Sequence, residues 1–104
     1  MDIQRRTTAK QTTIKLSGDL TIYEAASAKS LLLENHKGLD RKVLLNLQQV
    51  EELDTSGVQL LLMLQRLVQQ QGGELETVEV SESAGSILQL LRCQAALNLK
   101  EIDP

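Results

Sequence analysis

Three segments of the chain have the hydrophobic patterns of β-strands. Residues 12–16 alternate polar and apolar positions and are rich in β-branched side chains, which favours a strand. Residues 74–80 alternate cleanly, so we expect a strand with one face in solvent. Residues 43–47 are almost continuously apolar, which is typical of a central strand covered on at least one face.

The segments next to these strands carry weaker signals. Residues 17–19 (Ser-Gly-Asp) indicate a turn after the first strand, and residues 20–22 continue the chain as a short extended segment. Residues 48–52 are expected to form a connection after the central strand. Residues 98–102 are a candidate for a last short strand.

A first helix is predicted between Thr21 and about His36. Thr21 and Glu24 have the spacing of a capping box, in which the Thr oxygen accepts from a first-turn amide and the Glu reaches back to the cap. Lys37 and Gly38 provide the stop signal. The residues expected on its buried stripe are Ala25, Ala28, Leu31 and Leu32.

Two more helices follow in the second half of the chain. The longer one is predicted from Ser56 to Gln70 and ends before the glycine pair Gly72 and Gly73. Projected at helical spacing, its core face consists of Gly57, Leu60, Leu61, Leu64, Leu67 and Val68. The last helix is capped by Ser81 or Ser83. Its apolar positions are Ala84, Ile87, Leu88 and Leu91.

Strands that alternate with helices predict an α/β fold. The expected architecture is a single domain over residues 1–104, with its core between about 12 and 102 and a sheet that is at least partly parallel. Because residues 74–80 keep one polar face, the helices are expected mainly on the other side of the sheet.

The amino-acid composition argues against several classes of function. Tyr23 is the only aromatic residue, which almost excludes a platform for stacked bases. The formal net charge is −3 and no basic patch is visible, so nucleic acid is not an expected partner. No apolar run approaches the ~20 residues of a membrane span, and the first residues lack the apolar core of a signal peptide. We expect a cytoplasmic protein without direct membrane insertion.

Cys93 and His36 are the only cysteine and histidine. A lone thiol excludes an internal disulfide and a two-thiol metal or redox site. A single histidine gives little support for a Ser-His-Asp catalytic triad. We expect Cys93 to be a small core residue and His36 to lie in solvent near a helix end. The prediction is a protein that is not an enzyme and holds no metal or cofactor.

The segment Asp54-Thr55-Ser56-Gly57 stands at the start of the longest predicted helix. One of its side chains is expected to cap the free amides of that helix. A hydroxyl there is also a candidate phosphate acceptor, because first-turn amides and the helix dipole favour an anion. A phosphate would place about −1.5 to −2 charges on an exposed rim.

The same helix has a candidate docking surface. Gln59, Met63, Arg66 and Gln70 lie opposite its core face, and Val58 and Leu62 lie on one flank. Exposed Met and partly exposed aliphatic residues suit protein docking. Val58 and Leu62 pack under a neighbouring helix in the alternative interpretation. An exposed Leu62 and Met63 also allow a weak homodimer.

With these motifs the chain resembles the STAS domain family of anti-sigma factor antagonists. The resemblance covers about residues 12–102. It rests on the D-[ST]-S-G turn followed by an apolar helix, supported by weaker matches in the expected order. Those matches are Leu16-Ser17-Gly18-Asp19-Leu20, Val43-Leu44-Leu45-Asn46-Leu47, Leu53 before the turn, Val58 after it and the Gly72-Gly73 pair.

The resemblance implies a four- to five-stranded mixed sheet with helices mainly on one face and no catalytic residues. It also implies a partner kinase of the anti-sigma type that phosphorylates Ser56, with Thr55 as second choice. The unmodified form would bind the partner and the modified form would release it. The residues expected at the partner surface are Asp19, Thr21, Asp54, Thr55, Gly57, Val58, Gln59, Leu62 and Met63.

One departure from the pattern opens alternatives. Sigma-regulating members typically have Asp where this chain has Thr21, and residues 18–23 look more like stand-alone STAS proteins of chemotaxis or other two-component signalling. A second alternative is a constitutive scaffold subunit, similar to STAS proteins that bind a transporter ATPase. Some STAS domains bind nucleotides, but no G-x-x-x-x-G-K-[ST] loop occurs here. The resemblance implies a cytoplasmic, bacterial type of regulator.

Overall fold

The computed structural model of the chain describes residues 1–99 and contains a sheet with strand order β1-β2-β3-β4. The strands are β1 (Asp2–Thr7), β2 (Gln11–Leu20), β3 (Lys42–Leu53) and β4 (Glu74–Val80). The helices are α1 (Ile22–Leu33), α2 (Thr55–Gln70) and α3 (Glu82–Leu90). β1 is antiparallel to β2, whereas β2–β3 and β3–β4 are parallel pairs. Each parallel pair requires a crossover, and α1 and α2 supply them.

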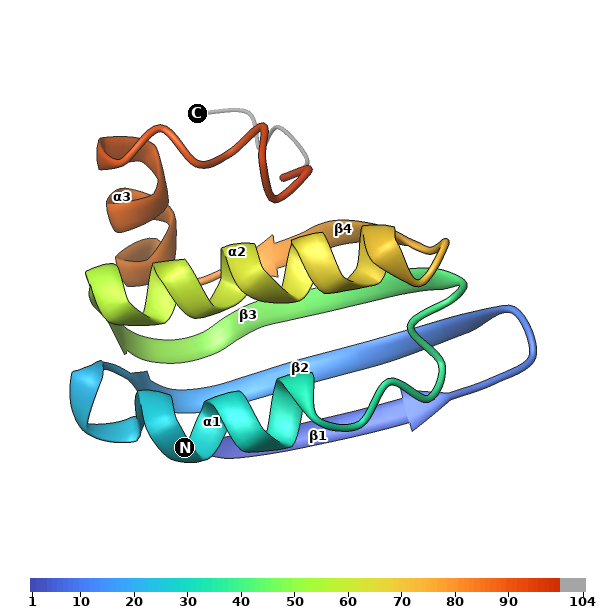
Figure 1. The fold of residues 1–104 in the computed structure, drawn as a ribbon. Coiled ribbons are helices and arrows are strands. Elements are labelled where there is room, and N and C mark those ends of the chain that lie inside the picture. The colour runs from blue at the N-terminus through green and yellow to red at the C-terminus, as the bar shows by residue number, and fades with distance from the viewer. Residues whose placement is uncertain (100–104) are drawn as a thin grey trace.

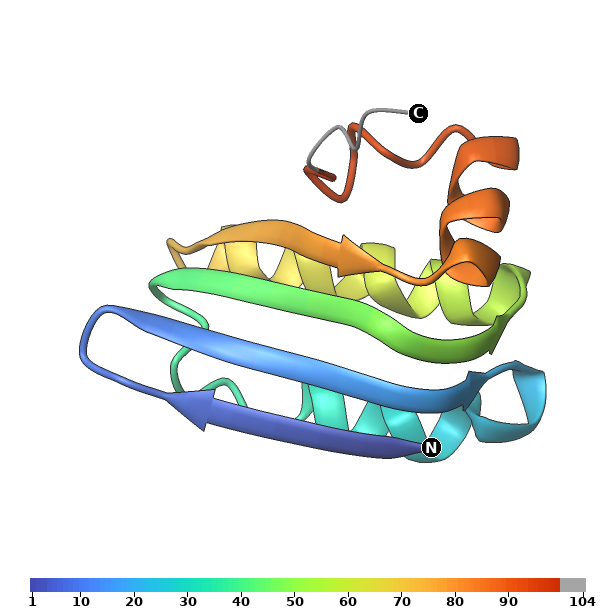
Figure 2. The ribbon, with the colours of Figure 1, turned by 180° about the vertical axis from the view of Figure 1, so that it is seen from behind.

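Helices α1 and α2 lie side by side over one face of the sheet (Figure 1). Seen from behind, the other face of the sheet carries no helix of this pair (Figure 2). α3 stands at the end of β4 with its axis steeply inclined to that of α2 (Figure 1). This α/β fold, with a four-stranded mixed sheet and helices mainly on one face, confirms the expected architecture.

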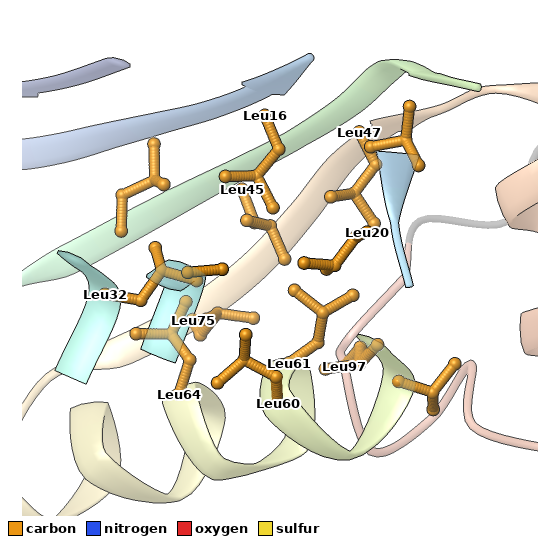
Figure 3. Packing of buried hydrophobic residues seen from close by; sticks show 14 of the residues in the cluster. Leu16, Leu20, Leu32, Leu45, Leu47, Leu60, Leu61, Leu64, Leu75 and Leu97 are labelled. Atoms are coloured by element: carbon orange, nitrogen blue, oxygen red, sulfur yellow. The ribbon is translucent and has the colours of Figure 1, made fainter. Parts of the chain in front are cut away.

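The core is almost entirely aliphatic. Alternation along β3 directs Val43, Leu45 and Leu47 toward the helices, because successive strand residues point to opposite faces. Leucines of α2, the helix in the lower part of the view, point toward these strand residues (Figure 3). The buried residues labelled in that view are Leu16, Leu20, Leu32, Leu45, Leu47, Leu60, Leu61, Leu64, Leu75 and Leu97.

The sheet is larger than the sequence pattern predicts. β1 was not expected, because Ile3 is its only apolar residue. Residues 17–19 are not a turn: β2 runs on through them to Leu20 with irregular pairing and with Gly18 at φ 97°. Residues 48–52 likewise belong to β3. Bulges explain both errors, since they interrupt the alternation while the strand stays paired.

The first helix differs from its prediction at both ends. It ends at Leu33, short of His36, and Thr21 occupies the N-cap position without a side-chain hydrogen bond. Glu24 does not complete a capping box: its Oε2 lies 3.8 Å from the amino group of Met1. Of the residues expected on its buried stripe, Ala28 and Leu32 are buried and Ala25 is half-buried, whereas Leu31 is 60% exposed.

The second half of the chain follows the sequence prediction closely. α2 ends at Gln70, and Gly72 takes a φ of 87° beyond it. Of the two candidate caps for α3, Ser81 accepts from Ala84 N–H at 3.0 Å. Of the expected apolar positions, Ala84 and Leu88 are buried in α3, whereas Leu91 lies just beyond the helix at its C-cap and is 36% exposed.

The candidate last strand is only partly observed. Leu99 forms an isolated parallel bridge with Thr77 of β4, and residues 100–102 lie outside the described residues. Among residues 1–99, no helix has both the length and the apolar character needed to cross a bilayer.

Candidate functional site

Asp54 links the beginnings of α1 and α2. Its Oδ1 accepts from Gly57 N–H at 3.0 Å, which caps α2. Its Oδ2 accepts from Ile22 N–H at 2.9 Å, in the first turn of α1. The expected cap is therefore present on α2. The same carboxylate supplies the hydrogen bond at the start of α1 that Thr21 does not make.

The two candidate hydroxyls occupy the first turn of α2. Thr55 is exposed and Ser56 is half-buried, so neither side chain is sealed inside the fold. Ser56 borders a shallow hollow of about 200 Å³ between α1 and α2. The other residues that line it are Ala25, Ala26, Lys29, Gln59, Leu60 and Met63. An anion on Ser56 would lie at the positive end of α2 and beside a hollow that the cationic residue Lys29 also lines.

Most of the predicted partner residues reach the surface of the molecule. Asp19, Thr55, Gln59 and Met63 are exposed, and Thr21 and Asp54 are partly exposed. Asp19 lies opposite Glu52 across the β2–β3 pair. Glu51 and Glu52 are also exposed, so the rim beside the α2 start is acidic.

Gly57 and Val58 are corrections to the expected partner surface. Val58 is 2% exposed and belongs to the core cluster. Gly57 is buried, and a Cβ there would overlap the carbonyl oxygen of Leu20 and the side chain of Leu53. Glycine at this position therefore lets α2 pack closely on the sheet. It does not admit a partner.

Leu62 and Met63 lie on different sides of α2. Leu62 is half-buried and packs against the core cluster, in agreement with the packing interpretation. Met63 is 39% exposed and lines the hollow beside Ser56. A second hollow, of about 230 Å³, continues the surface from Met63 along Leu33, Arg66, Leu67 and Gln70.

Two exposed residues of α1 were missed by the sequence analysis. Ile22 is 65% exposed and Tyr23 is 91% exposed. Ile22 is adjacent to the site through its hydrogen bond to Asp54. The signal in the sequence was an isoleucine and the single tyrosine directly after a helix cap. Ile22 was expected in the short extended segment 20–22 and Tyr23 counted as the single aromatic residue, so neither was expected at the partner surface.

Cys93 and His36 lie in different parts of the fold. His36 is exposed in the loop after α1, as expected for a solvated residue near a helix end. Cys93 is half-buried beyond α3 and packs against the core cluster. A search of the described residues finds no group of three or more His, Cys, Asp or Glu side chains placed to hold a metal ion.

The mixed sheet, the helix pair and the D-T-S-G turn at the start of α2 define the STAS class of α/β domains. A family profile described as "Mlab, STAS domain" matches residues 3–99. The chain therefore belongs to the STAS family. Comparison with curated protein sequences gives no match.

Solved structures share this fold at low sequence identity. A protein from Thermotoga maritima assigned as an anti-sigma factor antagonist superposes with a TM-score of 0.81 at 17% identity, over 96% of this chain and 86% of that one. The anti-sigma factor antagonist SpoIIAA, in its unphosphorylated form, gives 0.71 at 16% identity, over 98% and 89%. A STAS domain protein from Planctomyces limnophilus gives 0.74 at 21% identity, over 99% and 92%. The fold is that of anti-sigma factor antagonists.

Proposed function

We propose that this chain is a protein-binding switch controlled by phosphorylation of Ser56, with Thr55 as the second candidate acceptor. One observation carries the proposal. Ser56 is half-buried in the first turn of α2 and lines a surface hollow together with the exposed Met63, and the exposed Ile22 is hydrogen-bonded to the neighbouring Asp54. Apolar side chains gathered around a modifiable hydroxyl are suited to a protein partner that binds in only one modification state.

The physical basis is a difference in the cost of burying charge. In the free chain, a phosphate on Ser56 is stabilised by the N-terminus of α2 and by Lys29. A docked partner would cover the phosphate and remove water from it, at a cost that the apolar neighbours cannot offset. A loss of ~3 kcal/mol weakens binding about a hundredfold. Phosphorylation would therefore release the partner without unfolding the domain.

A solved structure with the same fold supports this proposal by analogy. SpoIIAA was solved in a form specified as unphosphorylated, so phosphorylation is a relevant state of that antagonist. By analogy, the partner of this chain is proposed to be an anti-sigma-type serine kinase or a two-component signalling protein. Asp19, Thr21, Gln59 and Met63 are the expected contacts beyond the acceptor, together with Ile22 and Tyr23.

The test combines mass measurement with matched variants. Protein isolated from its native cells should carry one phosphate, mapped to Ser56 or Thr55. Ser56→Ala should retain a partner from native lysate, and Ser56→Asp should lose it. Ser86→Asp is the control, because Ser86 is exposed on α3 and adds the same charge elsewhere. Equal capture by Ser56→Ala and Ser56→Asp would exclude the switch.

A constitutive scaffold is the second candidate, and the exposure of Ile22 and Tyr23 favours it. This apolar surface is available whatever the state of Ser56. The matching profile is also described as Mlab and not as an antagonist. A scaffold would lose its partner with Tyr23→Ala and keep it with Ser56→Asp. Absence of phosphate under varied growth conditions would also favour the scaffold.

A further inference from the structure

The outer edge of β1 has no strand paired to it within residues 1–99. β1 is the first strand of the sheet and pairs only with β2. An open strand edge presents unpaired N–H and C=O groups that can template another strand. We propose that a second copy of this chain pairs antiparallel along β1, joining two sheets into one.

The hairpin that follows β1 identifies which backbone groups are free. Thr8 N–H donates to Gln11 O at 2.8 Å, so this pair is hydrogen-bonded across the turn. Hydrogen-bonded and non-hydrogen-bonded pairs alternate along an antiparallel ladder. Alternation from Thr8 turns the backbone groups of Asp2, Gln4 and Arg6 toward β2. Those of Ile3 and Arg5 therefore point to the open edge.

These free groups fit one register of a symmetric pair. With a two-fold axis at Gln4, Ile3 of each copy lies opposite Arg5 of the other. Both residues have outward backbone groups, so each such pair exchanges two hydrogen bonds. Asp2 then lies opposite Arg6 at a non-hydrogen-bonded position, where cross-strand side chains are closest.

Charge selects this register over its neighbours. Asp2 and Arg6 are exposed and face uncharged Ser17 and Thr13 of β2. Pairing centred on Gln4 forms two Asp–Arg contacts across the axis. A shift of the axis to Arg5 sets the two Arg5 residues opposite each other, which is unfavourable. A shift to Ile3 shortens the ladder and leaves Arg6 without a carboxylate opposite.

The helix layer contributes a second observation. Glu24 of α1 approaches the amino group of Met1 beside β1, so this flank of α1 faces the open edge. Leu31 lies two turns along the same flank and is 60% exposed. In the joined sheet, the two α1 helices come to lie next to each other above the new strand pair. Each Leu31 is then covered by the other copy.

The test exchanges charges across the axis. The full wild-type chain should dimerise reversibly in sedimentation equilibrium over a concentration series that extends to millimolar. Asp2→Arg alone and Arg6→Asp alone should each weaken self-association about tenfold, because two attractive contacts become repulsive. An equimolar mixture of these two variants should associate as strongly as wild type, since every cross-axis pair is again Asp with Arg.

Gln4→Glu is an internal check. It places two carboxylates together on the axis, while within each chain the new carboxylate faces Lys15. The expected result is about fivefold weaker association with no loss of thermal stability. Met63→Ser tests the other candidate dimer surface and should leave association unchanged. A chain that stays monomeric throughout, or a dimer sensitive to Met63→Ser and not to the charge exchanges, would overturn the proposal.

Discussion

The carboxylate of Asp54 holds the backbone of Ile22, a residue 32 positions earlier in the chain, through a 2.9 Å hydrogen bond. The same side chain caps α2 by accepting from Gly57 N–H at 3.0 Å. One residue therefore fixes the relative position of the two helix starts on which the proposed partner surface is built.

Replacing Asp54 should destabilise both helix starts together. Asp54→Ala removes the cap of α2 and leaves Ile22 N–H without its acceptor, so we expect a loss of about 2 kcal/mol in the free energy of unfolding. Asp54→Asn keeps one carbonyl oxygen and should lose about half as much. Urea denaturation of the three proteins measures both changes. Equal stability of Asp54→Ala and wild type would contradict this role.

Gly57 is required for packing, and Gly85 provides a matched comparison. A Cβ at Gly57 overlaps the Leu20 carbonyl, so Gly57→Ala should cost about 3 kcal/mol through displacement of α2 from the sheet. At Gly85, in α3, a Cβ would meet only Val80 Cγ2 at an ordinary 3.5 Å. Gly85→Ala should therefore stabilise by about 0.5–1 kcal/mol through helix propensity. Thermal denaturation distinguishes the two signs.

Local sequence signals were sufficient where the interactions are local. α2, β4 and a serine cap for α3 could be predicted because their glycines, alternation and cap lie within a few residues of the elements they define. The D-T-S-G turn was located for the same reason. The sequence did not decide between Ser81 and Ser83 as the cap of α3. Val58 was misassigned because a helix projection does not reveal which flank the sheet and neighbouring segments cover. The projection did place Gly57 on the core face, where the structure has it, and only the resemblance led to its being expected at the partner surface.

The first third of the chain depends on distant partners, and there the sequence was less informative. The hydrogen bond at the start of α1 comes from Asp54, which no local motif can reveal. β1 is an edge strand with a single apolar residue, so its identity depends on pairing with β2. The exposure of Ile22 and Tyr23, which bears directly on function, likewise follows from where α1 docks.

The pKa of the Asp40 carboxyl should respond to its neighbour. Arg41 Nε donates to Asp40 Oδ1 at 3.0 Å, and this hydrogen bond with the nearby charge lowers the pKa of Asp40. The stabilisation is present above the unfolded-state pKa and is lost as pH falls through the lower folded-state pKa. In an NMR titration, Arg41→Gln should raise the Asp40 midpoint. Arg66→Gln, on exposed α2 surface, should leave it unchanged.

Ser81 joins the start of α3 to the sheet, and its replacement should show this double role. Its Oγ accepts from Ala84 N–H at 3.0 Å and donates to Val50 O at 2.6 Å. Ser81→Ala removes both bonds, so we expect a loss of about 2 kcal/mol. Ser81→Thr retains the hydroxyl and should recover most of it.

Ser83 supplies the control for this prediction, because it was the other cap candidate in the sequence. It is exposed within the first turn of α3, and Ser83→Ala should change stability by less than about 0.5 kcal/mol. Hydrogen exchange then locates the effect: amides of α3 should exchange faster in Ser81→Ala while those of α1 stay protected. If Ser83→Ala lost as much stability as Ser81→Ala, the assignment of Ser81 as the cap of α3 would be contradicted.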